Sequence, residues 1–317
     1  MVRSEVTHVL TVVPNYYDRF RCIGGDCRHN CCIGWEIGID DEALMRYRAW
    51  DGAWGERFAH AVSNEDGAHF ITDDNGRCPF LNSHGLCDIQ ATFGEPYLCD
   101  ICREHPRFHN ELPDRVESGL GLCCEAAARL ILGQEEPMTL FCRGEAETDE
   151  IVTWRDAVLR KLQNRSQSIE ERLAAVLADC EATMPPVSIG DWAEALLRLE
   201  RLDEQWTDRL HALQKSTGAV CATIPSSAYE QLLAYFVYRH AANAADRRGF
   251  AVRICFAVLG YRVIGALTAA VAEAGNEFDT FCDLARAFSA EIEYSDENFD
   301  IVLELLGGVY HGSDITG

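Results

Sequence analysis

The sequence predicts a mainly α-helical protein with a cysteine-rich N-terminal half and an all-helical C-terminal half. Two observations lead to this prediction. Ten of the 15 cysteines fall within the first 124 residues, among Gly, Asp and Asn turn signals. From about residue 147 onward, successive segments place apolar residues at helical spacing. We therefore expect a cysteine-rich domain over residues 1–145 and a helical domain over residues 146–317.

Short elements are predicted in the N-terminal half, with a minor β component. The segment 33–40, IGWEIGID, alternates apolar and polar residues as a half-buried strand does. The segment 69–71, HFI, precedes the turn-like DDNG and predicts a second short strand. Asp40 and Asp41 predict the start of a helix through DEALMRYRAW, because acidic residues cap free N–H groups and favour the helix dipole.

The C-terminal half reads as a helical bundle or array without a fixed-length repeat. Its most apolar segment, 250–274, is interrupted by Arg253 and Arg262, and only ten uninterrupted apolar or small residues follow Arg262. A membrane-spanning helix needs about 20 such residues, so a buried core helix is predicted. Cysteines that lie singly on apolar helical faces are expected to pack as small hydrophobic residues. These are Cys180, Cys221, Cys255 and Cys282.

Charge limits the classes of partner. The net charge is −23, from 51 acidic and 28 basic side chains. Such a chain repels phosphate backbones and anionic membranes, so neither nucleic acid nor a membrane is an expected partner. A lysine-rich protein surface would be attracted, although solubility alone also explains an acidic surface.

Clustered thiols are either joined as disulfides or gathered around a metal. The opening MVRSEVTHVLTVVP has only a short apolar stretch and predicts no secretory signal, so we expect a cytoplasmic protein with reduced thiols. The vicinal pairs 31–32 and 123–124 could not each form an internal disulfide without strain. A metal-binding N-terminal half is therefore predicted.

The cysteines form four groups along the chain. Two glycines in the first group, Gly24 and Gly25, allow the backbone to fold tightly. Structural zinc usually uses two Cys-x2-Cys knuckles, and only Cys99 and Cys102 have that spacing. Iron–sulfur clusters accept looser spacing. Zinc and iron–sulfur both remain open on spacing alone. The groups are Cys22-x4-Cys27-x3-Cys31-Cys32, Cys78-x8-Cys87, Cys99-x2-Cys102 and Cys123-Cys124.

The cysteine strings together resemble the flagellin lysine-N-methylase family, which is related to a broader group of zinc- or iron-chelating cysteine-cluster domains. The resemblance is carried by FRCIGGDCRHNCCIGWEIGID, GRCPFLNSHGLCDIQATFGEPYLCDICREHPRF and LGLCCEAAARLIL, with PNYYDRF and EIEYSDENFD as weaker matches. It implies a [4Fe-4S] centre and methyl transfer from S-adenosylmethionine to lysine amines of flagellin. The implied metal ligands are Cys22, Cys27, Cys31, Cys32, Cys78, Cys87, Cys102 and Cys124.

The chain departs from the family pattern at Cys123, where a small polar residue is common, and at His105, where an aromatic residue is common. No glycine-rich methyltransferase loop is recognised, because Gly119-Leu120-Gly121 is too short and follows no convincing strand. The cysteine spacing also differs from the usual radical S-adenosylmethionine motif, since Cys32 directly follows Cys31.

Methylation requires a neutral lysine amine, and the ordinary pKa of lysine is near 10.4. The site must therefore desolvate the amine or supply a base. Polar groups close in sequence to the cysteines are the weak catalytic candidates, and each also fits ordinary surface or packing roles. They are Tyr16, Tyr17, Glu104 and His105. Arg103 and Arg107 are candidates for binding the carboxylate of the methyl donor, or for balancing thiolate charge.

The sequence thus favours an iron–sulfur-dependent protein lysine N-methyltransferase. The alternative is a metal-chelating protein or zinc-stabilised scaffold without catalysis, since an acidic surface and clustered thiols suit that class as well. The oligomeric state is not predicted.

Overall fold

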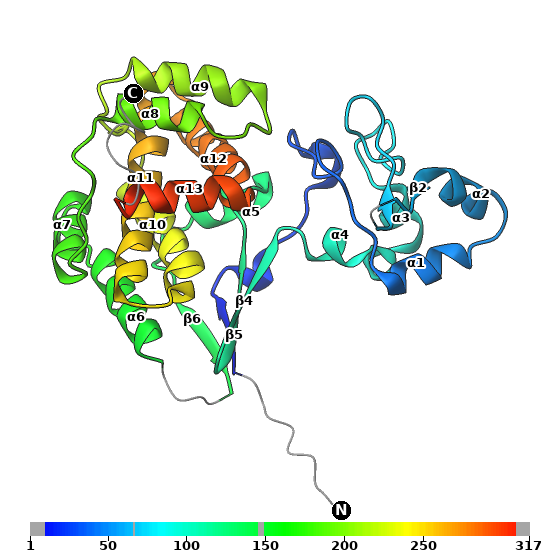
Figure 1. Cartoon of the computed structure of the whole chain (residues 1–317), viewed down its shortest axis with the longest axis horizontal. Coiled ribbons are helices and arrows are strands. Elements are labelled where there is room, and N and C mark those ends of the chain that lie inside the picture. The colour runs from blue at the N-terminus through cyan, green and yellow to red at the C-terminus, as the bar shows by residue number, and fades with distance from the viewer. Residues whose placement is uncertain (1–9, 66, 145–148, 309–317) are drawn as a thin grey trace, which may run out of the picture. The chain divides into compact units, whose positions relative to one another are not determined.

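The structure is a computed structural model that describes residues 10–65, 67–144 and 149–308. Packing divides the chain into two compact units (Figure 1). The cysteine unit comprises Arg21–Phe108 and Cys124–Ala126, and the helical unit comprises the rest. The cysteine unit is thus a long insertion in the chain of the helical unit. The predicted domain boundary at residue 145 stays a prediction; by packing, His109–Cys123 lies with the helical unit. The opening residues 1–9, part of the segment in which no secretory signal is predicted, lie outside the described residues.

The cysteine unit consists of short helices and loops around an aromatic core. Its elements are η2 (Gly24–Asp26), α1 (Asp41–Arg48), α2 (Gly52–Ala61), β2 (Val62–Ser63), β3 (His69–Phe70), α3 (Asp88–Phe93), η3 (Glu95–Tyr97) and α4 (Asp100–Glu104). Tyr47 and Phe80 are fully buried, and Trp54 lies parallel to Phe80 with ring centroids 6.2 Å apart. Aromatic burial supplies much of the hydrophobic stabilisation of so small a core.

Two local predictions are confirmed in this unit and one is wrong. The side chain of Asp40 accepts a hydrogen bond from Ala43 N at 2.8 Å and caps α1 as expected. The strand predicted at 69–71 is β3, paired antiparallel with β2. The strand predicted at 33–40 is absent: Ile33 and Gly38 form only isolated bridges, to Arg77 and His69. Alternating polarity there reflects alternating burial along an irregular loop.

Within residues 149–308, the helical unit contains eight longer helices, as the apolar periodicity predicts. They are α6 (Glu150–Leu162), α7 (Ile169–Asp179), α8 (Ile189–Leu197), α9 (Glu204–Gln214), α10 (Ser226–His240), α11 (Arg247–Val271), α12 (Glu277–Phe288) and α13 (Asp296–Leu306). The long helices α10 and α11 pack against each other at the centre of this unit (Figure 1). Described residues after 149 contain no strand.

Helix α11 covers most of the apolar segment 250–274, which the sequence predicts to be a buried core helix. Its length and composition would allow it to cross a membrane, but 78% of its apolar window is buried inside the protein. Phe256, Leu259 and Ile264 on this helix are at most 1% exposed. This burial is that of a core helix, as the sequence predicts.

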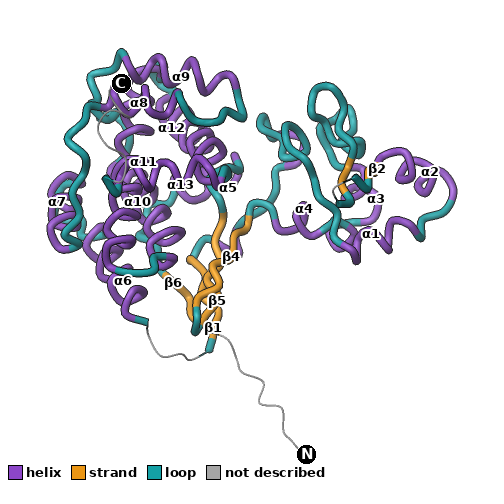
Figure 2. Tube along the Cα trace, viewed as in Figure 1, coloured by secondary structure: helices purple, strands orange, loops and turns teal. Residues whose placement is uncertain are grey.

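The sequence did not predict the four-stranded sheet (Figure 2). Its strands are β1 (Leu10–Pro14), β4 (Arg107–Leu112), β5 (Arg115–Leu120) and β6 (Leu140–Arg143), in the order β4-β5-β1-β6. Strand β1 pairs parallel with β5, in the register Leu10 to Arg115, and antiparallel with β6, in the register Val12 to Cys142. The short helix α5 (Glu125–Leu132) follows β5 in the chain.

Candidate functional site

Backbone pairing brings three predicted ligands of the cysteine unit together. The segments around Cys32 and Cys78 run side by side, because Cys78 N donates to Cys32 O at 2.8 Å and Gly34 N donates to Gly76 O at 3.0 Å. The chain between Cys78 and Cys87 forms a tight knuckle, which is closed by a β-bridge between Leu81 and Cys87. Cys32, Cys78 and Cys87 therefore meet at one side of the aromatic core.

The third cysteine group enters the same core from α4. Cys99 is the N-cap residue of this helix and Cys102 lies within its first turn. Arg103 N donates to Cys99 O at 2.9 Å, and Asp100 N donates to the α1 capping residue Asp40 at 2.7 Å. These bonds fix Cys99 and Cys102 on one side of a short helix. Cys99 is 1% exposed, although it is not among the ligands that the family resemblance implies.

The thiols are hydrogen-bonded in pairs. The hydrogen bond with Cys32 lowers the pKa of Cys31 to about 7 and raises that of Cys32. In the same way, Cys102 lowers the pKa of Cys99, and its own pKa is raised. One thiol of each pair is therefore more easily ionised, and thiolates are the form that binds metals.

The two remaining thiols of this group are harder to ionise. Burial raises the pKa of Cys78 to about 11, and burial also raises the pKa of Cys87. Neighbouring thiolate charge raises the pKa of Cys32 further, with contributions from Cys78 and Cys87. Several thiolates cannot accumulate here without a compensating cation. A bound metal ion would supply that charge and displace the thiol protons.

A second group of predicted ligands lies around Glu125. The carboxylate of Glu125 accepts hydrogen bonds from Arg28 N at 2.9 Å and Arg28 Nε at 3.0 Å, and Cys27 Sγ lies 3.9 Å from its Oε2. Burial raises the pKa of Cys27, and the charge of Glu125 raises it further. Burial opposes ionisation of Glu125 too, but the bonds from Arg28 hold its pKa below its usual value. Cys22 Sγ accepts a hydrogen bond from Gly24 N at 3.4 Å.

The donor set suits a thiophilic metal, but its geometry is not that of a formed site. Within residues 10–65, 67–144 and 149–308, no three His, Cys, Asp or Glu side chains converge as metal ligands do. Sulfur donors fit both zinc and iron–sulfur clusters, so the residues suit such a group by type and proximity, and binding it requires side-chain rotation. The metal centre stays a prediction.

The predicted catalytic residues are divided between the two units. Tyr16 and Tyr17 belong to the helical unit, and Tyr16 is fully buried. Burial raises the pKa of Tyr16, so its phenol stays protonated. Glu104 and His105 lie at the end of α4, in the same unit as the thiols. Burial lowers the pKa of His105 to about 4.

The two arginines predicted to bind the methyl donor also lie in the cysteine unit. Arg103 forms an ion pair with Asp100 and contacts Glu104 Oε1 at 3.5 Å. Arg107 Nη1 donates to Arg103 O at 3.2 Å. Acidic neighbours thus already balance Arg103, and a donor carboxylate would have to compete with them.

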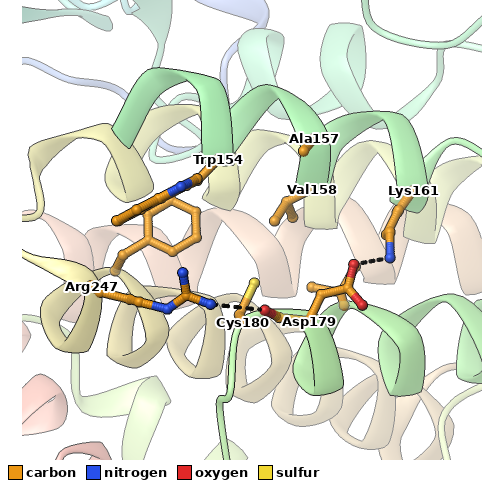
Figure 3. Close-up of a pocket in the computed structure, with 9 residues that line it drawn as sticks. Trp154, Ala157, Val158, Lys161, Asp179, Cys180 and Arg247 are labelled. Atoms are coloured by element: carbon orange, nitrogen blue, oxygen red, sulfur yellow. Dashed lines mark hydrogen bonds and ion pairs between the residues drawn. The ribbon is translucent and has the colours of Figure 1, made fainter. Parts of the chain in front are cut away.

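A cavity of about 180 Å³ lies in the helical unit, between α6, the end of α7 and the start of α11 (Figure 3). Its wall includes the Cys180 thiol, and Arg247 lies over the Trp154 ring at 5.3 Å. Lys161, one of two lysines in the chain, forms an ion pair with Asp179 at the rim. The cationic groups are paired within the protein, so the cavity offers no charge that requires a ligand.

A buried polar network in the helical unit was not predicted. It joins α10 to the segment 289–294 through Tyr235, Arg239, His240 and Glu293, and the partly exposed Tyr294 ring lies over Arg239. Part of it lies in the string EIEYSDENFD, one of the two weaker matches to the family in the sequence. Cys123 also lies in the helical unit, whereas Cys124 is grouped with the cysteine unit.

The fold and its thiols define a mainly helical protein with an inserted cysteine cluster. The chain is similar to the flagellar biosynthetic protein FliU of Salmonella muenchen, with 28% identity over 162 residues, which cover 49% of this chain and 92% of that protein. It is also similar to the lysine-N-methylase of Salmonella typhimurium, with 29% identity over 40% of this chain. The lysine-N-methylase of Salmonella choleraesuis is 28% identical over the same share.

These relatives confirm the resemblance to the flagellin lysine-N-methylase family that the cysteine strings predict. The matched region spans 33% of each lysine-N-methylase, so the activity of those whole proteins is not carried over with it. No family model matches the chain. No solved structure matches it either.

Proposed function

We propose that this protein is a lysine N-methyltransferase that acts on flagellin, uses S-adenosylmethionine as methyl donor and depends on an iron–sulfur centre. The observation that supports the proposal most directly is the gathering of Cys32, Cys78, Cys87 and the Cys99–Cys102 pair around one small core. The names of the relatives support the methyl-transfer reaction and the flagellar substrate.

Two groups of thiols would hold the metal. Cys32, Cys78, Cys87 and Cys102 form the first, with Cys99 as the hydrogen-bonded neighbour of Cys102. Cys22, Cys27 and Cys31 lie along the first loop, and Cys124 directly precedes Glu125. A bound iron–sulfur centre would supply an electrophilic or redox-active iron site. It would also add cationic charge that keeps the thiols ionised.

A side chain of the site must also accept the proton that the substrate lysine loses. A lysine ammonium must lose a proton before its nitrogen can attack the sulfonium methyl, with the thioether as leaving group. His105 is the candidate base in this unit, because its ring nitrogen can accept a proton. Burial lowers its pKa to about 4 and makes it a weak base, so the site would also have to desolvate the substrate amine and lower the pKa of that lysine. The His105 ring centroid lies 6.3 Å from that of Trp35. Glu104, next to it, pairs with Arg103 at 3.5 Å.

Analysis of iron, sulfide and zinc in protein purified without oxygen tests which metal the thiols bind. Brown protein with matched iron and sulfide is expected. Incubation with S-adenosylmethionine, reductant and the host's flagellin should then add methyl groups to lysine. Cys31→Ala and Cys102→Ala should lose both colour and methylation, because each removes a sulfur donor. Cys142→Ala is the matched control, since Cys142 is an exposed thiol on β6 in the helical unit.

The same experiment identifies the alternative. Colourless protein with stoichiometric zinc and no methyl transfer would favour a zinc-stabilised scaffold or a metal-chelating protein. Iron-loaded protein that methylates neither flagellin nor another host protein would favour metal handling. Equal loss of metal in the Cys31→Ala, Cys102→Ala and Cys142→Ala proteins would contradict the assignment of ligands.

A further inference from the structure

Another cavity of the helical unit, which we call the α8 cavity, is larger than the one beside Trp154. It has a volume of about 530 Å³ and lies between the start of α7, the start of α8, the loop after α9 and the middle of α11. All of these segments belong to the helical unit. Cavities that hold small-molecule ligands have volumes of about 300–1,000 Å³, so the α8 cavity is large enough for such a ligand.

One wall of the α8 cavity is a loop that two helices hold in place. Gly218 has a φ of +76°, a left-handed conformation that favours glycine, and a Cβ atom there would lie 3.0 Å from Ile189 Cγ2 on α8. On the other side, a Cβ atom at Gly265 of α11 would lie 2.6 Å from Val220 Cγ1, and Cys221 N donates to Gly265 O at 3.0 Å. The loop is therefore packed against both helices, and the fold itself builds this wall.

A buried tyrosine holds a carboxylate at the α8 cavity. Tyr261 is 2% exposed, and its hydroxyl donates to Glu170 Oε1 at 2.8 Å. Burial and the hydrogen bond with Glu170 raise the pKa of Tyr261, so the hydroxyl keeps the proton that it donates. Glu170 is exposed, and its Oε2 atom has no hydrogen-bond or ion-pair partner among the residues that the structure describes. This carboxylate can therefore accept a cationic donor without losing the contact that orients it.

Arg262, the next residue on α11, brings the opposite charge to the same cavity. Its side chain is exposed and forms no hydrogen bond or ion pair with any residue in 10–65, 67–144 or 149–308. It differs in this respect from Lys161 and Arg247 at the cavity beside Trp154, which are both paired. No ion pair joins Arg262 to Glu170, although both line the α8 cavity. The two opposite charges are therefore available to a ligand that lies between them.

The charges around the α8 cavity disfavour a simple anion or a simple cation. Ser188 N donates to Asp191 Oδ2 at 2.8 Å and Asp191 N donates to Ser188 Oγ at 3.2 Å, so a capping box already places a carboxylate at the start of α8. A free anion would also meet Glu170, and a free cation would meet Arg262. The net charge of −23 adds to the repulsion of anions. A ligand that carries both signs of charge fits these surroundings best.

We infer that the α8 cavity binds a zwitterion of the α-amino-acid class, with its carboxylate on Arg262 and its ammonium group on Glu170. An arginine fork matches a carboxylate in a bidentate pair, and an ammonium group donates charge-assisted hydrogen bonds to a carboxylate. The side chain of the ligand then lies against the apolar part of the wall, which includes Val187, Ile189 and Val220. Two sources carry this chemistry: a free amino acid, and an amino acid that bears a nucleoside. The inference is independent of the proposed function, because the site consists of the helical unit alone.

Saturation-transfer NMR on the full chain provides the test. The probes are L-leucine, a free amino acid with an apolar side chain, and S-adenosylhomocysteine, an amino acid that bears a nucleoside. At least one should bind, and the tighter of the two identifies the source. Arg262→Gln and Glu170→Gln should each raise its Kd about tenfold or more, the change expected when a charge-assisted hydrogen bond is lost. Both side chains are exposed, and glutamine at 170 keeps an oxygen for Tyr261, so both variants should fold.

Analogues that lack one charge show whether both charges are needed. Isocaproate is leucine without its ammonium group, isoamylamine is leucine without its carboxylate, and methylthioadenosine is the nucleoside without the amino acid. Each should bind about tenfold more weakly than its parent zwitterion. The matched control protein is Arg160→Gln, which removes an exposed arginine of α6 outside the cavity and should leave Kd unchanged. Absence of binding by both zwitterions, equally tight binding of the analogues, or equal effects of Arg262→Gln and Arg160→Gln would overturn the inference.

Discussion

Gly25 offers the sharpest test of how the cysteine unit is built. A Cβ atom at Gly25 would lie 2.5 Å from the carbonyl oxygen of His84, well inside the 3.4 Å at which ordinary contact begins. The obstacle is backbone, so it cannot rotate away. Asn30 Nδ2 also donates to Gly85 O at 2.8 Å and ties the same two loops together. Gly25→Ala must therefore push the first cysteine loop away from the knuckle between Cys78 and Cys87.

The expected cost is that of overpacking, about 1–3 kcal/mol. This is a large share of the total of about 5–15 kcal/mol that stabilises an ordinary domain. Hydrogen exchange of peptides from residues 22–34 and 76–88 measures the loss of local stability in these two loops. A loss of 1.4 kcal/mol accelerates exchange through local opening about tenfold. Metal content should fall in parallel, because the two loops carry most of the predicted ligands.

Gly38→Ala is the control in the same unit. Nothing lies within 4 Å of a Cβ at Gly38, and its backbone is not in the left-handed region. Its exchange should match the wild type or slow slightly, since alanine restricts the unfolded chain. Equal exchange in the Gly25→Ala and Gly38→Ala proteins would refute the close approach of the two loops.

Three further results are expected. Burial lowers the pKa of His105 in the folded protein to about 4, from an ordinary 6.5, so folding favours the neutral ring. The free energy of unfolding should therefore be highest above pH 6.5 and should fall by up to about 3 kcal/mol as the pH is lowered toward 4. Urea titrations at pH 7 and pH 5 should show this loss, and His105→Phe should show a smaller one. Metal removal should accelerate hydrogen exchange in residues 21–108 and leave α10 and α11 protected; equal protection of both regions after complete removal would contradict a structural role for the metal. Cys180→Ala should enlarge the cavity beside Trp154 and cost about 1 kcal/mol in thermal unfolding, with methylation unchanged; activity loss as great as in Cys31→Ala would overturn the packing role of Cys180.

The sequence predicted elements whose signals are local. The helices from α6 onward follow from apolar spacing, and Asp40 caps α1 as its position suggests. The sheet was missed because its central pairing joins Leu10 to Arg115, and no local pattern records a partner so distant. The strand predicted at 33–40 is absent because a local pattern cannot supply a pairing partner. Alternating polarity without an adjacent strand yields only isolated bridges.

The candidate site was predictable in composition but not in arrangement. Cysteine spacing indicated which thiols matter, and the hydrogen-bonded pairs Cys31–Cys32 and Cys99–Cys102 became visible only in three dimensions. The Glu293 network joins residues from three distant segments. Its only sequence trace is a run of acids near a tyrosine, which looks like an exposed helix start.

The insertion of the cysteine unit has a consequence for the order in which the protein is made. Residues 21–108 are translated before strands β5 and β6, which flank β1. At about 5–20 residues per second, the roughly 200 residues that follow take on the order of 10–40 s to synthesise. During that interval the nascent thiols meet the cell's metal supply before their host scaffold exists. For the proposed metal centre, the supply of metal during translation would then influence the yield of loaded protein.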